Sequence, residues 1–330
     1  MKQDLKPTTP LYKTNLGSAH VGDSLFLLKR LPDSSVDLVV TSPPFPLKRP
    51  KEYGNLVGKE YEDWLVSFAE EVLRVLKDTG SFVIDLGGTY LKGRPVRSLY
   101  NYRLLLRFVE ETGFRLAEEF FWFNPSKLPS PIEWVNKRKI RVKDSVNTVW
   151  WLSKTDYPKA DVRNVLAPYS KRMRKLLENP DRYYQEASRP SGHSISSGFG
   201  KENAGAIPPN LLSISNSESN STYINYCKAV GIKPHPARFP SKLPEFFIRF
   251  LTDPNDLVID IFAGSNTTGW AADSLGRKWL AFELDHKYLS SSIFRFLPPK
   301  LPRDHLEEVF TELLKNPEAQ MDVDYTLLLT

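Results

Sequence analysis

Short apolar runs alternate with helical patterns in two separate parts of the chain, residues 18–155 and 243–296. In the first part, apolar runs at residues 36–40 and 81–86 are typical of buried strands, and apolar residues recur at helical spacing over residues 61–76. Strands that alternate with helices are typical of a parallel sheet with helices on both faces. We therefore predict an α/β fold built on a doubly wound, mostly parallel sheet.

Further elements complete this pattern. We expect Gly80 to end the helix over 61–76 and Gly113 to end a helix over 104–111. The other expected strands lie near residues 120–123, 148–152, 257–261 and 278–283, and the other expected helices at 243–251, 267–275 and 287–296. Beyond about residue 300 the pattern predicts only a peripheral tail.

The segment between the two parts, residues 156–234, is rich in Ser, Asn, Pro and Gly. A long segment without periodic runs is unusual inside a compact domain unless it has a binding role. Asn, Ser and Arg side chains of this segment could hydrogen-bond to base edges if the partner is a nucleic acid, and the alternative is an ordinary surface loop, which contains the same residues.

Composition sets broad limits. With 330 residues the chain can form one large α/β core and a smaller region. Its net charge of +6 permits a polyanionic partner. No apolar run approaches the length of a membrane span, and no apolar run follows Met1 as in a secretory signal. The single cysteine, Cys227, favours a reducing compartment such as the cytoplasm, and the five scattered histidines predict no metal site.

A glycine turn follows the expected strand at residues 257–261. At Gly264 no Cβ hinders the approach of a ligand, and Glu283 ends the next strand 19 residues later, where a carboxylate can accept both hydroxyls of a ribose. Asn266 stands where a dinucleotide site needs a second glycine against a pyrophosphate. The pattern therefore favours S-adenosylmethionine, which has no phosphate, over NAD, while a strand–helix–strand unit without any ligand remains an alternative.

The segment Ser42-Pro43-Pro44-Phe45 follows the strand at residues 36–40. Two prolines fix the backbone and leave the Ser42 hydroxyl and the proline carbonyls as a rigid row of acceptors. Such acceptors can hold the hydrogens of an amino group and free its lone pair for attack on an activated methyl group. Phe45 offers a ring on which a flipped base can stack. The alternative is an ordinary turn with a core phenylalanine.

These two motifs have a known counterpart. Residues 37–45 and 260–268 resemble the catalytic and cofactor motifs of the β-class DNA amino-methyltransferases, which use S-adenosylmethionine, and the catalytic motif comes first here as in that class. The resemblance covers nearly the whole chain and includes residues 54–56, 123–127, 134–139 and 235–240. It implies a permuted Rossmann-like methyltransferase fold, base flipping, a double-stranded DNA substrate, and a separate restriction endonuclease that acts on the same site without a stable complex.

The resemblance also assigns regions and residues. It implies a catalytic half at 1–155, a target-recognition region at 156–234, an S-adenosylmethionine-binding half at 235–300 and a tail at 301–330. Catalytic roles fall on Ser42, Pro43, Pro44, Phe45 and Asp85, of which Asp85 receives or relays a proton. Cofactor-binding roles fall on Asp23, Ala237, Arg238, Pro240, Asp260, Phe262, Gly264, Ser265, Asn266, Thr267 and Glu283.

Within that class, serine at position 42 points to cytosine N4, because the adenine-N6 members more often carry aspartate there; adenine N6 remains the alternative. Carbon-5 methylation needs a cysteine nucleophile, and Cys227 lacks the Pro-Cys context of those enzymes, so we expect it to be structural or incidental. Two alternatives from other classes are a nicotinamide-dependent oxidoreductase and a cofactor-free DNA-binding module. The likeness continues through residues 189–193 and 207–220, which implies the target CAGCTG.

Three groups of basic residues are candidates for contacts with DNA phosphates. Lys137, Arg138, Lys139, Arg141 and Lys143 interleave with Ile140 and Val142, which predicts a strand with a basic face; a solvated surface is the alternative for any one group. Lys48, Arg49 and Lys51 follow the catalytic turn, and a third group, expected to be helical, spans residues 171–175. Binding through such contacts is expected to weaken steeply with salt.

Overall fold

The computed structural model describes residues 9–46, 58–179, 203–217, 221–316 and 320–323. It divides into two compact units, a larger one formed by residues 1–159 with 210–330 and a smaller one formed by residues 160–209. The chain therefore leaves the larger unit once and returns to it.

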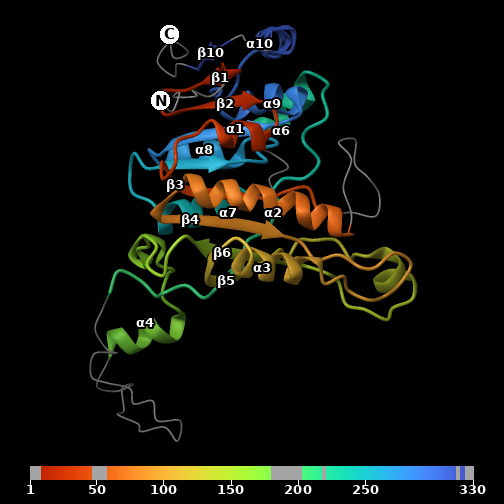
Figure 1. Cartoon of the computed structure of the whole chain (residues 1–330), viewed down its shortest axis with the longest axis vertical. Coiled ribbons are helices and arrows are strands. Elements are labelled where there is room, and N and C mark those ends of the chain that lie inside the picture. Colours follow the sequence, from red (N-terminus) through yellow and green to blue (C-terminus); the bar gives the residue numbers. More distant parts are fainter. Residues whose placement is uncertain (1–8, 47–57, 180–202, 218–220, 317–319, 324–330) are drawn as a thin grey trace, which may run out of the picture. The chain divides into compact units, whose positions relative to one another are not determined.

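The larger unit is built on one sheet in which ten described strands run in the order β10-β1-β2-β9-β8-β3-β4-β6-β5-β7 (Figure 1). The strands are β1 (Tyr12–Lys13), β2 (Gly17–Val21), β3 (Val36–Thr41), β4 (Leu76–Leu86), β5 (Arg115–Phe123), β6 (Val146–Ser153), β7 (Leu211–Ser213), β8 (Leu257–Asp260), β9 (Lys278–Glu283) and β10 (Met321–Asp322). From β2 to β4 every neighbouring pair is parallel, whereas β6 runs antiparallel to both β4 and β5. The predicted doubly wound α/β sheet is confirmed.

Helices cover both faces of this sheet. One face packs against α1 (Ser24–Lys29), α2 (Gly58–Val75) and α3 (Tyr100–Glu110), which lie in front of the sheet in Figure 1. The other face packs against α6 (Thr222–Ala229), α7 (Lys242–Leu251), α8 (Thr267–Ser274), α9 (His286–Ser292), the short 3-10 helix η4 (Ile293–Arg295) and α10 (Arg303–Lys315). Successive residues of β3 explain the two cores, because Val39 packs on the first face and Leu38 and Val40 on the second.

The order of the strands brings the two sequence motifs together. Strand β3, which precedes Ser42, lies directly beside β8, which precedes Gly264. From this pair the chain continues outward in both directions, from β3 to β4 and from β8 to β9. Ligands of open α/β sheets bind at the carboxyl ends of the strands at such a switch point, so the fold places both turns at one binding edge.

The expectations for the end of the helix before Gly80 and for the C-terminal tail were wrong. Helix α2 ends at Val75 and Gly80 lies inside β4, because β4 begins at Leu76 and pairs with β3 from its first residue. The tail after residue 300 is not peripheral. Its helix α10 buries Leu313 and other apolar side chains in the core, and β10 pairs with β1.

The smaller unit contains the 3-10 helix η2 (Val162–Val165) and helix α4 (Lys171–Glu178). Mutual backbone hydrogen bonds of 2.8 Å join Ala167 and Ala206, and the N-cap Ser170 accepts a hydrogen bond from the backbone N–H of Met173 at 3.1 Å. The basic residues at 171–175 are therefore helical, as expected. Residues 180–202, which include the expected sequence-reading segment 189–193, lie outside the described residues.

Candidate active site

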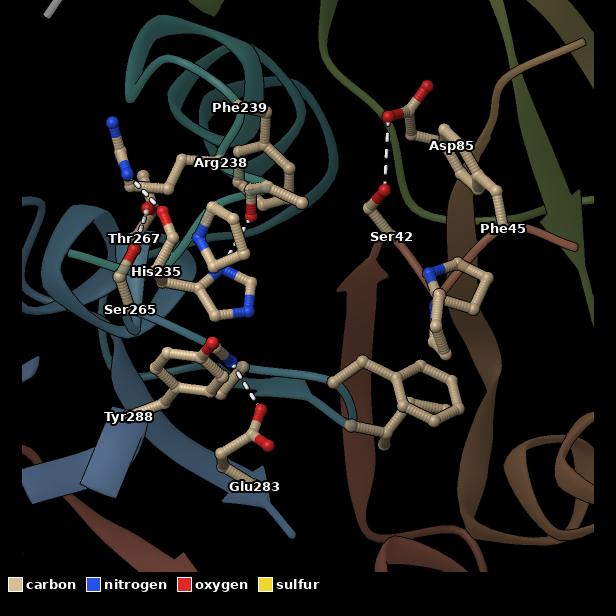
Figure 2. A pocket seen from close by; sticks show the side chains of 18 of the residues that line it. Ser42, Phe45, Asp85, His235, Arg238, Phe239, Ser265, Thr267, Glu283 and Tyr288 are labelled. Carbon is tan, nitrogen blue, oxygen red and sulfur yellow. Dashed lines mark hydrogen bonds between the residues drawn. The ribbon is translucent and has the colours of Figure 1, made fainter. Parts of the chain in front are cut away.

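A cavity of about 810 Å³ lies in the larger unit, at the carboxyl ends of the central strands. Its wall includes both turns, with Ser42, Phe45 and Asp85 on one side and Glu283, Tyr288 and His235 on the other (Figure 2). The segments that supply these residues are far apart in the sequence and meet only because β3 and β8 are neighbours.

The carboxylate of Asp260 joins the two turns beneath the cavity. Its oxygens accept hydrogen bonds from the hydroxyls of Thr41 and Thr268, both at 2.7 Å, and from the backbone N–H of Phe262 at 3.1 Å. Thr41 ends β3 directly before Ser42, and Thr268 lies in the first turn of α8. Asp260 is buried and fixes the end of β3 against the start of α8.

On the catalytic side, the Ser42 hydroxyl donates a hydrogen bond to Oδ2 of Asp85 at 3.1 Å (Figure 2). Asp85 lies near the end of β4, beside β3, so the two residues face each other from neighbouring strands. With its proton directed at Asp85, the Ser42 oxygen presents its lone pairs as acceptors. The pair can therefore hold a donor group and pass its proton to the carboxylate.

Burial raises the pKa of Asp85 to about 6. Hydrogen bonds from Asn147 and Ser42 and the charge of Lys127 lower it in part. Nδ2 of Asn147 lies 3.0 Å from Oδ1 and 3.4 Å from Oδ2 of Asp85, and Lys127 is on the wall of the same cavity. A carboxylate with a pKa near 6 is ionised at neutral pH and still basic enough to accept a proton.

Phe45 lies against the end of β4. A Cβ on Gly87 would come within 2.5 Å of the Phe45 ring, so glycine is required for this contact. The Tyr100 hydroxyl donates a hydrogen bond to the Gly87 carbonyl and so holds the same backbone. The ring of Phe45 therefore has a fixed place beside Ser42 and Asp85.

On the opposite side, Glu283 holds the cofactor turn. Its Oε2 accepts a hydrogen bond from the backbone N–H of Gly264 at 2.7 Å, and its Oε1 accepts one from the N–H of Asp285 at 2.9 Å. Burial raises the pKa of Glu283 to about 7, although these two hydrogen bonds lower it in part. The remaining lone pairs of the carboxylate are available to hydroxyl donors in the cavity.

The conformation of the turn explains its glycine. Gly264 has φ of +52°, and a Cβ there would come within 2.9 Å of the His235 ring. The missing Cβ thus accommodates the His235 ring, and Gly264 itself lies on the wall of the cavity; that a ligand approaches its backbone stays a prediction. Asn266 also has a positive φ, +51°, and its side chain accepts from the N–H of Gly269 as the N-cap of α8.

Two arginines hold the loops that carry the expected cofactor-binding residues Ser265 and Arg238. Arg295 is buried and donates hydrogen bonds to the carbonyl and hydroxyl of Ser265 at 2.6 Å and 3.0 Å. Arg238 donates a hydrogen bond to the His235 carbonyl, and Asn216 holds the Arg238 carbonyl at 2.8 Å. The buried hydrogen bonds fix the loop at Ser265, and the more exposed hydrogen bonds hold the backbone at Arg238.

The described residues fit S-adenosylmethionine in two further respects. Phe262 packs between Trp64 and Phe68, with ring centroids at 5.4 Å and 5.0 Å, and all three line the cavity as an apolar surface for an adenine. The Tyr61 hydroxyl is buried on the same wall and has no hydrogen-bond partner among the described residues. A ligand with polar atoms would give this hydroxyl a partner.

Comparison with known proteins gives the family. A family model described as DNA methylase matches residues 36–294. The type II methyltransferase M.PvuII of Proteus hauseri is 59% identical over 313 residues, which cover 95% of this chain and 93% of the relative.

The chain belongs to the DNA methylase family. A solved structure of the PvuII DNA methyltransferase (cytosine-N4-specific) matches with a TM-score of 0.78 and 52% identity, over 96% of this chain and 97% of that one. A structure of M1.HpyAVI in complex with SAM matches with a TM-score of 0.52 at 19% identity, over 86% of this chain and 100% of that one, which supports the fold alone. The resemblance to the amino-methyltransferases is confirmed, and the oxidoreductase and the cofactor-free module are excluded.

The methylase fold brings most of the expected site residues to one cavity. Those on its wall are Asp23, Ser42, Pro43, Pro44, Phe45, Asp85, Ala237, Arg238, Phe262, Gly264, Ser265, Thr267 and Glu283. Pro240, Asp260 and Asn266 are not on the wall. Asp260 and Asn266 instead fix the turns from behind, through the hydrogen bonds given above.

The expected DNA contacts have different outcomes. Lys48, Arg49 and Lys51 lie outside the described residues. Lys137, Arg138, Lys139 and Arg141 are exposed and none lines the cavity. The strand predicted for them was wrong.

A π-helical turn, η1 (Glu133–Lys137), takes the place of that strand. Ion pairs from Glu133 to Lys137 and Arg138 stabilise it, and the buried Trp134 anchors it. Beyond the turn, Lys139 has a positive φ, +56°, which extended strands do not allow.

Several methylase site residues were missed from the sequence. They are Tyr61, Trp64 and Phe68 of α2, together with Trp122, Asn124, Lys127, Ser145, Asn147, Asn216, His235, Phe239 and Tyr288. Segments 123–127 and 235–240 had been matched to the family, and that was the available signal for Lys127 and His235. Asn147 gave no signal, because its contact with Asp85 depends on the antiparallel pairing of β6 with β4.

Cys227 is buried in α6, and burial raises the pKa of its thiol to about 11. A buried thiol with a raised pKa is a poor nucleophile, in agreement with the structural role expected. Among the described residues no cluster of His, Cys, Asp or Glu could hold a metal ion. In the same part of the chain, no helix combines the length and apolar composition of a membrane span.

Proposed function

We propose that this methylase transfers the methyl group of S-adenosylmethionine to the N4 amino group of cytosine in duplex DNA, as the modification enzyme of a restriction–modification system. The observation that carries the proposal is that the Ser42–Asp85 pair and the Gly264–Glu283 turn line one cavity. The first pair suits an amino group and the second suits an adenosine. The specificity of the PvuII relatives for cytosine N4 supports the choice of base.

Ser42, Asp85 and their neighbours would hold the target amino group and accept its proton. When bound, S-adenosylmethionine supplies a methyl group activated by its sulfonium. The Ser42 oxygen and the Pro43 carbonyl accept the two hydrogens of the target amino group, which directs the nitrogen lone pair toward the cofactor side. As the N–C bond forms, the bond from the methyl carbon to the sulfonium sulfur would break and leave a neutral thioether. One proton would pass from the nitrogen to the Ser42 oxygen while the Ser42 hydroxyl passes its own proton to Asp85 over their 3.1 Å hydrogen bond. Phe45 stacks on the flipped base.

On the cofactor side, Glu283 would accept the ribose hydroxyls and Asp23 the adenine amino group, with Phe262 against the adenine ring. Ala237, Arg238, Ser265 and Thr267 would contact the methionine portion. Pro240, Asp260 and Asn266 would act from behind the wall, by fixing the segments that touch the cofactor.

The region 156–234 would read the target sequence, for which CAGCTG is the first choice, and residues 1–155 and 235–300 would form the two halves of the methyltransferase domain. A paired endonuclease would cleave the same site in unmethylated DNA without forming a stable complex with the methylase. The cytoplasmic location expected from the single cysteine belongs to the same proposal.

The test is product analysis. The protein is incubated with methyl-labelled S-adenosylmethionine and a duplex that contains CAGCTG, and the labelled nucleoside is identified after digestion. We expect N4-methyl-2′-deoxycytidine, no label in a duplex with a scrambled site, and resistance of the product to an endonuclease that cuts CAGCTG. Label in N6-methyl-2′-deoxyadenosine would overturn the choice of base, and label in the scrambled duplex would overturn the target.

Replacement of Ser42 tests the mechanism. We expect Ser42→Ala to lower the rate of methyl transfer by two orders of magnitude or more, roughly the effect of removing one preorganised hydrogen-bonding group, and to leave the Kd of the cofactor unchanged. Ser35→Ala, which removes a hydroxyl outside the cavity, is the control. Equal reductions of rate and of cofactor affinity in Ser42→Ala would mean that the turn only supports the fold.

A further inference from the structure

Two segments of the larger unit form an arm next to the cavity. Residues 87–99 follow the end of β4, and residues 124–145 connect the end of β5 to the start of β6. Figure 1 shows the two segments side by side, extending from the ends of these strands with the η1 turn within the second segment. We call residues 87–99 with 124–145 the arm; its base lies next to Asp85 and Asn147, which occupy the same strand ends.

Side-chain contacts give the arm a defined structure. Arg97 of the first segment pairs with Asp144 of the second at 2.5 Å, and Arg141 of the second donates to the carbonyl of Pro95 in the first at 2.8 Å. Arg97 also lies over the ring of Tyr90, 5.1 Å from its centroid. The two segments are thus joined at several points, and a ligand that binds one of them will also meet the other.

The net charge of the arm is more positive than the net charge of the whole chain. It contains nine Lys or Arg residues and only two acids, a net charge of +7, against +6 for the entire chain. Both acids are already paired, Asp144 with Arg97 and Glu133 with Lys137 and Arg138. Among the described residues, Lys92, Arg94 and Lys139 are exposed and no carboxylate lies within ion-pair distance of them.

Such a concentration of like charge destabilises the free protein through self-repulsion and is relieved by a polyanion. The position of the arm indicates that the polyanion is DNA. Asn124, Lys127 and Ser145 belong both to the base of the arm and to the wall of the cavity. A nucleotide base that enters the cavity remains attached to its phosphates, which must pass this part of the arm. Single phosphates or small anions would not need a charged surface as extended as the arm.

We propose that the arm grips the phosphates of duplex DNA on either side of the target base, and that its first segment, through Lys92 and Arg94, is as much a part of this interface as the second. This proposal rests on the proposed function and adds the surface by which the substrate is held. The exposed ends of Lys92 and Arg94 are cations on a loop, which suit phosphate oxygens without regard to sequence. The arm therefore contributes affinity, and the reading of the sequence lies elsewhere.

The test compares two neutralised double variants with the same change of net charge. In Lys92→Gln/Arg94→Gln the charges are removed from the arm. In the control, Lys228→Gln/Lys278→Gln, the charges are removed from two exposed positions that do not line the cavity. Lys228 is near the end of α6 and Lys278 is the first residue of β9. The Kd of each variant is measured over a salt series for a CAGCTG duplex and for a scrambled duplex, with cofactor Kd and Tm as checks of folding.

At 0.1 M salt, we expect the Kd of the arm variant for both duplexes to be higher by about tenfold or more. The slope of log K against log salt should decrease by up to about 2, because each phosphate that a side chain no longer neutralises lowers it by roughly 0.9. The control should keep the slope of the wild type. An equal increase of Kd in both variants would show that only net charge matters. An unchanged Kd of the arm variant would show that the first segment is not part of the interface. Weaker binding of the CAGCTG duplex alone would mean base reading instead of phosphate binding.

The result separates this proposal from the proposed function. If the wild type transfers no methyl group to any duplex, the proposed function fails. If the wild type methylates DNA and the arm variant binds and methylates equally well at every salt concentration, the arm proposal alone is overturned.

Discussion

Asn147 donates from its side-chain amide to the carboxylate of Asp85, 3.0 Å from Oδ1. The contact crosses from β6 to β4, which pair antiparallel, and it lies on the side of Asp85 away from the sequence motif that contains Ser42. A hydrogen bond to the charged form of an acid stabilises that form and lowers its pKa. Asn147 therefore offsets part of the increase that burial causes at Asp85.

The first prediction follows from this contact. In Asn147→Leu the carboxylate no longer has this donor, so its pKa should rise further above 6 and the acidic limb of the pH–rate profile should move to higher pH. The measurement is kcat against pH from 5 to 9 under saturating substrate. Lower activity without movement of the limb would mean that Asn147 acts on the fold and not on the proton acceptor.

Thr148→Val provides a matched control for this experiment. Thr148 is the next residue of the same strand, and its hydroxyl donates to the Leu86 carbonyl at 2.9 Å without contact with Asp85. The variant lacks a hydrogen bond of similar length and should keep the wild-type pH profile.

The second prediction concerns stability. In the unfolded chain Asp85 has an ordinary pKa of about 3.9, and in the folded protein about 6. At a pH between these two pKa values, the folded state binds more protons than the unfolded state. The free energy of unfolding therefore contains a favourable contribution from Asp85 below the unfolded-state pKa, and this contribution is lost as pH rises through about 6.

Asp85→Asn removes the buried charge and should raise the free energy of unfolding at pH 8 by roughly 1–3 kcal/mol, since one pKa unit corresponds to about 1.4 kcal/mol. At pH 4 the gain should be much smaller. The measurement is denaturant unfolding of both proteins at the two pH values. A variant less stable than the wild type at pH 8 would show that the carboxylate stabilises the folded state through its hydrogen bonds.

Glu283 gives the third prediction. Its charged form holds Gly264 and would accept the ribose hydroxyls, and its pKa is about 7. Protonation removes lone pairs from the binding face, so cofactor affinity should fall as pH decreases from 8 to 6. In Glu283→Gln affinity should be about tenfold or more lower at pH 8 and should vary little with pH. Calorimetric titration with the cofactor measures both, and a wild-type Kd that is constant over this range would contradict the assignment.

Much of the fold follows from the sequence, because β3, β8 and β9 are apolar runs and α7 has regular helical spacing. The adjacency of β3 and β8 could also be inferred from the family, since two turns that serve one reaction must lie at one edge of the sheet. The short strands β1 and β10 could not be predicted. They contain two residues each, and their pairing is a property of the assembled sheet.

The site shows the same division. Ser42, Gly264 and Glu283 stand at strand ends, where the local pattern indicates them, whereas Asp85 was assigned only by the resemblance to the family. Asn147 reaches the site through the pairing of β6 with β4, and Tyr61 through the packing of α2 on the sheet, and neither relationship is encoded within a short segment. The contact of Gly264 with the His235 ring could not be inferred locally, because that ring comes from a segment 29 positions earlier.

The fourth prediction tests the role of the C-terminal helix, for which the sequence pattern indicated only a tail. In α10 two adjacent leucines differ in environment: Leu313 is fully buried in the core, and Leu314 is 36% exposed. Leu313→Ala removes buried apolar surface and leaves a cavity, which typically costs about 2–5 kcal/mol. We expect it to lower the free energy of unfolding by about 3 kcal/mol, measured by denaturant titration. Leu314→Ala makes the same chemical change one position along the helix and should cost less than about 1 kcal/mol. Equal and small effects of the two substitutions would show that α10 packs only loosely on the core. A large effect of Leu314→Ala alone would show that the other face of the helix is the buried one.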